Sequence, residues 1–398
     1  MPKDELKQIT IIIPTYNRHH YLTRLLSYYA SKNTDASILV LDSSEAATAK
    51  LNQQTCEGLS KHITYHYFPS STPVASKLLA GLKLVKTAYC AFCADDDLVF
   101  IEGLQQALAF LQENDDYVCA DGIYLNFHQV NHDVNLHIEY ASKGINAEDP
   151  GARIFRLFQK YESLFYGVFR TTQAIDIFSA VSKNPSLHYQ ELFQATSALL
   201  LGKSHRLPVF YAARQHCDPA DTSRDKWQTY YWFAEDRSEF MQHYLQYREE
   251  LWQFYQTHVS DKTHARTDLN QILDIAHAMY FGLGCPPAYF HSVLQTCWPQ
   301  DSFRKPNMFT DNVCNQLKSA RRVHWEEQLF KFFKWLPKKL ASLYWPFYLK
   351  SLNRDIYKRT QYPWNCALRK ELAWLTSKKE FRLAYQELCL YLGRNNAL

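Results

Sequence analysis

The sequence predicts an α/β protein, in which helices flank a mostly parallel sheet, followed by a mainly helical C-terminal region. Apolar runs of strand length alternate with helical patterns over roughly the first 125 residues. Polar residues stand where several of these strands end, and from about residue 225 the pattern becomes helical and rich in aromatic residues. The chain has 398 residues, 46% of them hydrophobic, which is enough for two or three domains.

Four apolar segments have the length and composition of buried strands: residues 9–13, 37–41, 62–68 and 87–94. Apolar residues at helical spacing follow the first strand at Leu22, Leu25, Leu26 and Tyr29. Further helices are expected at about residues 45–60, 74–85 and 101–111, and residues 117–127 are expected to be extended. This alternation predicts the first domain.

The next ninety residues, roughly, are less regular. Residues 128–150 are polar and predict a loop or a short excursion. Residues 166–170 predict a strand, residues 191–201 a helix closed by Gly202, and residues 206–214 another extended segment. The expected division is a first domain of residues 1–224, whose two halves meet near residue 127, and a helical region of residues 225–398.

Asp95, Asp96 and Asp97, called the acidic triplet below, follow the fourth predicted strand. Adjacent carboxylates repel one another unless a positive charge lies among them, and a divalent cation with oxygen ligands is a common solution. In an extended segment Asp95 and Asp97 point to the same side, so two carboxylates are able to face one metal ion. The alternative is a solvated acidic turn.

Polar residues also stand at the ends of the first two strands, Pro14 and Thr15 at the first and Asp42 at the second. Ligands of parallel α/β sheets bind at the carboxyl ends of the strands. These residues and the acidic triplet are therefore expected to converge on one crevice, although they are far apart in the sequence.

The composition argues against several other classes. No run of about 18 apolar residues predicts a spanning helix, and the polar N-terminus does not have the features of a secretory signal. The ten cysteines are scattered. Cys90 and Cys93 lie in an apolar strand, which predicts buried thiols rather than a zinc or redox site. A cytoplasmic location fits this pattern.

Positive charge is concentrated near the C-terminus. Residues 301–398 hold 19 Lys and Arg against 8 Asp and Glu, whereas residues 1–300 hold 25 against 32. In residues 329–350, Phe, Trp and Leu interleave with Lys, which fits an amphipathic element on an anionic membrane. The alternative is a helical domain with an aromatic core and solvated lysines, and nucleic-acid binding is a weaker third option.

Three segments together resemble family 2 glycosyltransferases of the GT-A fold. They read Ile-Ile-Ile-Pro-Thr-Tyr-Asn-Arg at residues 11–18, Leu-Asp-Ser-Ser at 41–44 and Cys-Ala-Asp-Asp-Asp at 93–97. The resemblance covers roughly residues 8–217. It implies inverting transfer of a sugar from a nucleotide-diphosphate sugar, with Mg²⁺ or Mn²⁺ held by a D-x-D-type motif. Residues 1–127 would then bind the donor and residues 128–224 the acceptor.

The resemblance also implies roles for single residues. Pro14, Thr15 and Asn17 would line the nucleotide pocket, Asp42 would hydrogen-bond the base, and Lys77 would reach ribose or phosphate. A solvated helix lysine is the alternative for Lys77. The family more often has two acidic residues and Gly-Ser where this chain has Leu-Asp-Ser-Ser, so the identity of the base stays open.

The acidic triplet would serve the donor and the metal ion, with Asp95 and Asp96 on the nucleotide sugar and Asp97 on the metal. His216 would be a second metal ligand and Arg214 a phosphate contact. A surface position is the alternative for both. Arg170 is expected to face the acceptor cleft.

Transfer also requires a base for the acceptor hydroxyl. The resemblance places an acidic residue at the start of a helix under the acceptor, and Glu191 in Tyr-Gln-Glu-Leu is the best match. The alternative is a glutamate favoured there by the helix macrodipole. Asp121 is the second candidate for the base.

The expected partners are a nucleotide-sugar donor and a glycan or lipid-linked acceptor, as in capsule, O-antigen or lipopolysaccharide assembly, with no nucleic acid. Residues 301–398 would contact the inner face of the cell membrane. A nucleotidyltransferase is one alternative, disfavoured because no Gly-rich phosphate loop follows the first strand. A non-catalytic glycan- or membrane-binding module is the other.

Overall fold

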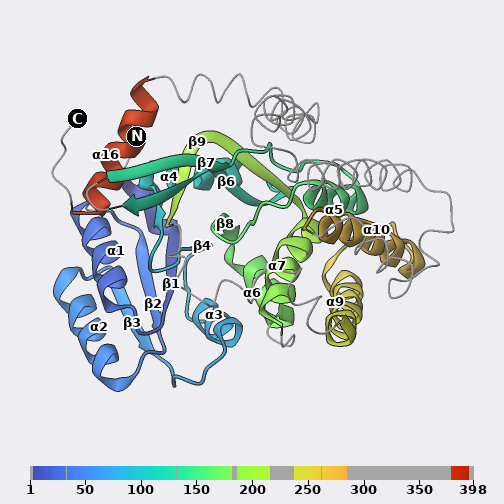
Figure 1. The fold of residues 1–398 in the computed structure, drawn as a ribbon, viewed down its shortest axis with the longest axis horizontal. Coiled ribbons are helices and arrows are strands. Elements are labelled where there is room, and N and C mark those ends of the chain that lie inside the picture. Colours follow the sequence, from blue (N-terminus) through green and yellow to red (C-terminus); the bar gives the residue numbers. More distant parts are fainter. Residues whose placement is uncertain are drawn as a thin grey trace, which may run out of the picture.

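The computed structural model describes residues 3–32, 34–130, 133–181, 186–215, 237–260, 262–284 and 378–393. A nine-stranded sheet runs through them in the order β3-β2-β1-β4-β8-β6-β9-β5, and β7 pairs with β6 (Figure 1). The strands are β1 Ile9–Thr15, β2 Ser37–Asp42, β3 Ile63–Tyr67, β4 Tyr89–Phe92, β5 Leu98–Val99, β6 Tyr117–Val130, β7 Asp133–Tyr140, β8 Val168–Arg170 and β9 Lys203–Gln215.

The first four strands form the parallel sheet that the alternating pattern predicts, since β2 and β4 run parallel to β1 and β3 runs parallel to β2. The rest of the sheet is mixed. Strand β8 lies antiparallel between β4 and β6, whereas β9 runs parallel to β6. The predicted α/β class is confirmed, and its parallel part coincides with the segments that showed the clearest alternation.

Helices connect the strands and cover both faces of the sheet. They are η1 Lys3–Gln8, α1 His19–Ser31, α2 Ala46–Leu59, α3 Val74–Leu82, α4 Ile101–Glu113, α5 Pro150–Gln159, α6 Thr171–Val181, α7 Leu187–Leu201, α9 Arg237–His258, α10 Arg266–Gly284 and α16 Lys378–Tyr391. In the described residues, no helix is both long and apolar enough to cross a membrane.

The alternation of side chains along β1 divides the core in two. Ile12 packs in a cluster with Leu78 of α3, whereas Ile11 and Ile13 pack on the other face with residues of α1 and α4 such as Leu22. Each of these isoleucines is fully buried, which stabilises the fold by roughly 1.5–3 kcal/mol per side chain. The strand is therefore fixed in register, and its carboxyl end has a defined position.

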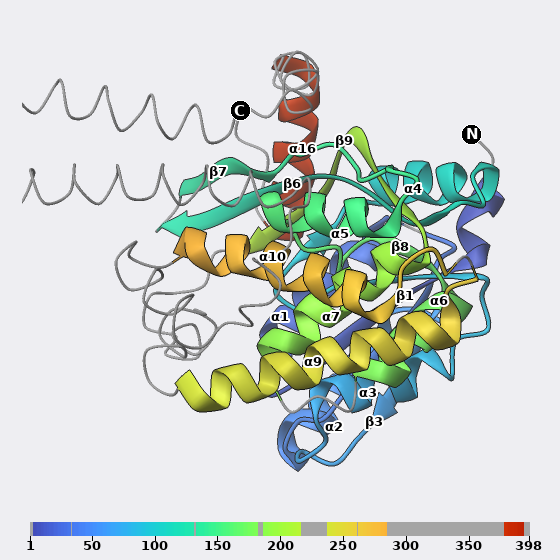
Figure 2. The same cartoon turned by 90° about the vertical axis from the view of Figure 1, so that its right-hand side faces the viewer.

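Helices α9 and α10 pack on α7 and α5, respectively (Figure 2). Phe158, Phe193 and Tyr247 lie in one buried cluster that these helices share with the sheet. The predicted domain boundary at residues 224–225 lies outside the described residues, as do residues 329–350. The division into two domains and the amphipathic tail therefore remain predictions.

Two secondary-structure predictions need correction. Residues 128–150 were expected to form a loop, but β6 extends to Val130 and forms an antiparallel hairpin with β7. The period-two alternation in Val-Asn-Leu-His-Ile-Glu-Tyr, residues 134–140, was the signal for this strand. The helix expected from residue 191 begins four residues earlier, where the Ser186 side chain caps α7.

Helix α16 comes from the C-terminal end of the chain yet packs on α1, near the N-terminus (red in Figure 1). Leu388 is fully buried in the same cluster as Leu25 of α1. The Tyr28 hydroxyl donates a hydrogen bond to Glu387 Oε2 at 2.7 Å, and Lys32 also pairs with Glu387. The last described helix is thus a neighbour of α1, near the start of the chain.

Candidate active site

The strand ends converge as the sequence predicts. The Thr15 hydroxyl, at the end of β1, donates to Asp95 Oδ2 at 2.7 Å. The backbone N–H of Ser43, which follows β2, donates to the Thr15 carbonyl oxygen at 3.2 Å. Three segments that are far apart in the sequence therefore meet at one edge of the parallel sheet.

Asn17 shapes the turn after β1. Its φ of 54° lies in the left-handed region, which asparagine tolerates better than most residues. Its backbone N–H donates to Ser44 Oγ at 2.8 Å, and its side-chain oxygen accepts from the Glu45 N–H at 2.9 Å. Asn17 thus ties the turn to the end of β2, while Pro14 lies in β1 opposite Leu41.

Asp42 is fully buried, and its carboxylate faces the protein. It accepts hydrogen bonds from the Ser44 N–H at 2.7 Å, the Asn52 side chain at 2.8 Å and the Tyr65 hydroxyl at 3.0 Å. In this arrangement Asp42 stabilises the end of β2. The contact with a nucleotide base remains a prediction.

Lys77 is buried at the start of α3 and bridges two strand ends. Its Nζ donates to the Thr15 carbonyl at 2.9 Å and to Ser43 Oγ at 2.8 Å. Burial lowers the pKa of Lys77 to about 8, although Asp42 and Asp95 act in the opposite direction. Lys77 is therefore not a solvated helix lysine, and its charge lies beneath the site.

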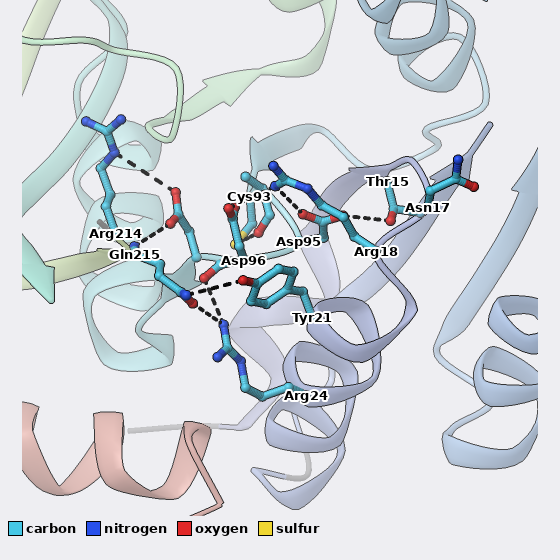
Figure 3. A network of polar contacts seen from close by, with 12 residues as sticks. Thr15, Asn17, Arg18, Tyr21, Arg24, Cys93, Asp95, Asp96, Arg214 and Gln215 are labelled. Atoms are coloured by element: carbon cyan, nitrogen blue, oxygen red, sulfur yellow. Dashed lines mark hydrogen bonds and ion pairs between the residues drawn. The ribbon is translucent and has the colours of Figure 1, made fainter. Parts of the chain in front are cut away.

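Arg18 offsets part of the charge of the acidic triplet (Figure 3). Its Nη1 lies 2.8 Å from Asp96 Oδ2 and 3.3 Å from Asp95 Oδ1. The Arg18 side chain is 41% exposed, so it remains accessible from solvent. Burial raises the pKa of Asp95 to about 6, against the lowering effect of the Thr15 hydrogen bond. Sequence reasoning included Arg18 in the motif but gave it no role.

Asp97 is also buried and has other partners. The Gln215 N–H donates to Oδ1 at 2.7 Å, the Tyr166 hydroxyl donates to Oδ2, and Arg214 Nε lies 4.0 Å from Oδ2. Burial raises the pKa of Asp97 to about 7, Asp96 acts in the same direction, and Arg214 opposes both. The end of β9 thus provides the positive charge nearest to Asp97.

Glu191 of α7 is a second carboxylate on which the Arg214 charge acts. Burial raises the pKa of the Glu191 carboxyl, and the Arg214 charge lowers it, as do hydrogen bonds from Tyr161 and Ser163. The Tyr161 hydroxyl donates to Glu191 Oε1 at 3.1 Å, and Arg214 donates to the Tyr140 hydroxyl at 3.0 Å. The Arg214 charge therefore acts on both Asp97 and Glu191.

The position of Glu191 in α7 tests the alternative that the helix macrodipole alone favours a glutamate there. The helix begins at Leu187 and has no acidic residue in its first turn. Glu191 lies in the second turn, where the favourable effect of the helix N-terminus on a carboxylate has largely decayed. Its half-buried position beside Arg214 and Tyr161 therefore needs another explanation.

Two other sequence candidates lie away from this group. Asp121 is buried in β6 and paired with Arg206, whose Nε lies 3.0 Å from Oδ1 and whose Nη2 lies 2.8 Å from Oδ2. Arg170 donates to the Leu111 carbonyl, at the end of α4, and to the Tyr89 hydroxyl, at the start of β4. The structure therefore places Arg170 at the opposite end of β4 from the acidic triplet.

We expect Asp121→Asn to reduce the free energy of unfolding by about 3 kcal/mol, because it leaves the buried Arg206 charge only partly compensated. The measurement is the urea midpoint at unchanged slope. The control is Asp115→Asn, which removes a carboxylate that is 98% exposed and should cost less than about 0.5 kcal/mol. Equal midpoints for the two variants would contradict a structural role for Asp121.

The donor set for a metal ion is only partly described. Asp97 lies at the site, whereas His216 falls outside the described residues. Among the residues that are described, no group of three His, Cys, Asp or Glu side chains is arranged to hold a metal ion. Asp96 pairs with Arg18 through Oδ2, and its carboxylate is a second oxygen donor of the kind that a hard cation prefers.

The fold and the site define an α/β protein with an acidic ligand site at the carboxyl ends of its parallel strands. Residues 10–171 match the family described as glycosyl transferase family 2, so this part of the chain is similar to the glycosyltransferases of that family. The resemblance seen in the sequence is confirmed over these residues. Glu191, Arg214 and His216 lie beyond the match, so their roles rest on geometry or remain predictions.

Individual relatives are distant. The chain is 26% identical over 141 residues to an uncharacterized glycosyltransferase of Rickettsia conorii, covering 35% of this chain and 22% of that protein. The chain thus spans about a fifth of the length of this curated relative.

Two solved structures have similar folds at low identity. TarS of S. aureus (residues 1–349, in complex with UDP-GlcNAc) is 15% identical, with a TM-score of 0.46 over 79% of this chain and 81% of that one. A mannosyltransferase of Pyrobaculum calidifontis, in complex with GDP-Man and Mn²⁺, is 12% identical, with a TM-score of 0.42 over 80% and 83%. Likeness at this level assigns no residue and no substrate to this chain.

Proposed function

We propose that this protein transfers a sugar from a nucleotide-diphosphate sugar to a glycan or lipid-linked acceptor, with inversion at the anomeric carbon. The observation that carries the proposal is the position of Arg214, whose charge acts on both Asp97 and Glu191 at the strand ends of a family 2 domain. A cation between two carboxylates suits a reaction in which a diphosphate leaves on one side and a hydroxyl loses a proton on the other.

The donor is proposed to bind over the ends of β1, β2 and β4. Thr15 and Asn17 border this edge, and the Lys77 charge lies beneath it. Arg18 is 41% exposed and already contacts two carboxylates, so its guanidinium is well placed to bind a diphosphate in bidentate fashion. These positive charges would balance the negative charge that grows on the leaving group.

A divalent cation, Mn²⁺ or Mg²⁺, is proposed as the cofactor. The carboxylates of Asp96 and Asp97 are the hard oxygen donors that such ions prefer, and His216 is the further ligand proposed from the sequence. When bound, the ion would act as a Lewis acid on the diphosphate. The residues of this chain supply the rest, since Tyr166 and the Gln215 N–H hold Asp97 in place.

Glu191 is proposed as the base that accepts the proton of the acceptor hydroxyl. A half-buried carboxylate whose pKa is raised binds a proton more readily than an exposed one, which suits this role near neutral pH. Tyr161 donates to Oε1 and so orients the carboxylate. The acceptor is proposed to lie between α7 and the β6–β7 hairpin, because Tyr140 of that hairpin contacts Arg214.

We expect one nucleotide sugar among UDP, GDP, CMP and dTDP donors to raise the melting temperature with Mn²⁺, and EDTA to abolish this rise, because only the folded state binds the donor. A rise in melting temperature that persists in EDTA would contradict the proposal that donor binding requires a metal ion. No rise with any donor would contradict the donor class. Release of pyrophosphate from a sugar phosphate and a nucleoside triphosphate would instead indicate a nucleotidyltransferase.

The cellular setting is also a proposal. The cysteines within the described residues are free and buried, which fits the cytoplasm. The charge of residues 301–398 supports attachment of that region to the inner face of the membrane. The family supports a role in capsule or lipopolysaccharide assembly.

A further inference from the structure

Arg24 of α1 lies next to the acidic triplet and the end of β9 (Figure 3), and it also contacts the end of α16. Its Nη2 donates to the Asp96 carbonyl oxygen at 3.0 Å, to Gln215 Oε1 at 2.7 Å and to the Tyr391 hydroxyl at 2.7 Å. These acceptors belong to the loop after β4, the end of β9 and the end of α16. One guanidinium therefore connects residues that are up to 367 positions apart in the chain.

Tyr391 closes this group from the C-terminal end of the chain. Its hydroxyl donates to the Asp96 carbonyl oxygen at 2.8 Å, and its ring lies 4.3 Å from the Arg24 guanidinium carbon. The side chain is 1% exposed and packs edge-on against Phe127 and Tyr28. The carbonyl of the central residue of the triplet thus accepts two hydrogen bonds, both from helices that lie outside the sheet.

The connection continues to Asp97 through the end of β9. Arg24 holds the Gln215 side chain, and the Gln215 N–H donates to Asp97 Oδ1 at 2.7 Å. The Asp97 N–H is itself bonded to the Ala94 carbonyl at 3.2 Å, which closes the turn. Neighbouring negative charges in this turn repel one another, so the backbone needs donors that fix its shape.

We propose that Tyr391 and Arg24 are positioning residues, through which the C-terminal helix α16 holds the acidic triplet in the geometry that binds the donor. The inference rests on the proposed function, because it deepens the role of the same site. It assigns to α16 a part in a site whose other described residues lie between Pro14 and Gln215. Without the Tyr391 hydroxyl, the Asp96 carbonyl loses one hydrogen-bond donor, and the backbone turn at the acidic triplet becomes more mobile.

The alternative is that α16 stabilises the protein only as a whole. A second tyrosine separates the two cases, because Tyr28 also joins α1 to α16 through its hydroxyl, which bonds Glu387. This bond makes no contact with the triplet, and Lys32 still pairs with Glu387 when it is removed. Tyr28→Phe is therefore a matched control for Tyr391→Phe, with the same atom deleted from the same helix interface.

The experiment compares the full-length wild type, Tyr391→Phe and Tyr28→Phe. We expect Tyr391→Phe to weaken donor binding about fivefold, the equivalent of one hydrogen bond, while Tyr28→Phe binds like the wild type. Hydrogen–deuterium exchange of the Asp97 and Gln215 amides should also speed up about fivefold in Tyr391→Phe and stay unchanged in Tyr28→Phe. Urea midpoints of both variants show how much each hydroxyl contributes to global stability.

Equal donor affinity and equal exchange in the two variants would overturn the inference, whatever their stability. A wild type that binds no donor would overturn the proposed function instead. In that case the exchange rates of the two amides still decide whether Tyr391 holds the triplet, because this measurement needs no ligand. Failure of the one proposal is thus distinguishable from failure of the other.

Discussion

Replacement of Glu191 by glutamine is expected to lower the turnover of sugar transfer by a factor of about 10³ while donor affinity stays within about twofold of the wild type. Glutamine keeps the shape of the side chain and can still accept the hydrogen bond from Tyr161, so the helix and the site should keep their structure. It cannot accept the proton of the acceptor hydroxyl. The measurement is kcat with saturating donor, beside donor titration of both proteins.

The control for this variant is Glu113→Gln on the exposed surface of α4, which should leave kcat unchanged. Normal transfer by Glu191→Gln would show that another group is the base. A loss of donor affinity equal to the loss of kcat would show that Glu191 supports the donor rather than the acceptor.

The pH profile provides a second measure of the same role. Burial raises the pKa of Glu191 above its ordinary value of 4.5. A base acts in its deprotonated form, so activity should be lost as the pH falls through the raised pKa, and the acidic limb of kcat/KM should lie above pH 4.5. In Glu191→Gln the part of this limb that comes from Glu191 should disappear, whereas the part that comes from Asp97, whose pKa is raised to about 7, should remain.

Replacement of Asp97 by asparagine is expected to weaken metal-dependent donor binding by a factor of about 100. The variant removes the charge of a buried carboxylate but keeps its size. One side-chain position still accepts from the Gln215 N–H, and the Tyr166 hydroxyl can turn to accept from the new amide. The expected loss is therefore one of cation and donor affinity rather than of the fold.

The check is titration of the donor with and without Mn²⁺, beside the urea midpoint. Asp115→Asn, which changes an exposed carboxylate, serves as the control. Donor binding by Asp97→Asn that remains strong and dependent on Mn²⁺ would contradict the role of Asp97 as a ligand. Together with Glu191→Gln, this variant separates binding of the donor from transfer of the sugar.

Much of the fold could be predicted because its signals are local. The short length and the β-branched residues of Ile-Thr-Ile-Ile-Ile favour a buried strand, and the spacing of Leu22, Leu25 and Tyr29 marks one face of a helix wherever they lie in space. The β6–β7 hairpin was missed because polar residues alternate with apolar ones there. The segment was interpreted as a loop because it is polar, although its apolar and polar residues alternate with the period of two that is typical of a strand.

The candidate site was predictable only in part. Strand ends indicated Thr15, Asp42 and the acidic triplet, since parallel strands bring their carboxyl ends to one edge of the sheet. No local pattern distinguishes Asp121, which pairs with the buried Arg206, from Glu191, which faces Arg214. Both are single acidic residues in regular structure, and only their partners differ.

The sequence by itself determined the alternation of strands and helices over roughly the first 125 residues, the similarity of residues 10–171 to family 2 glycosyltransferases and the edge of the sheet at which polar residues gather. Only the tertiary structure decided which charges meet there, with Arg18 on Asp95 and Asp96, Arg214 near Asp97, and Tyr391 on the Asp96 carbonyl. The spacing of apolar residues along one helix or strand shows which of its faces is buried, and this pattern can be read within a short segment of sequence. Pairing of charges and hydrogen-bond donors depends on distances between segments hundreds of residues apart, and folding alone sets those distances.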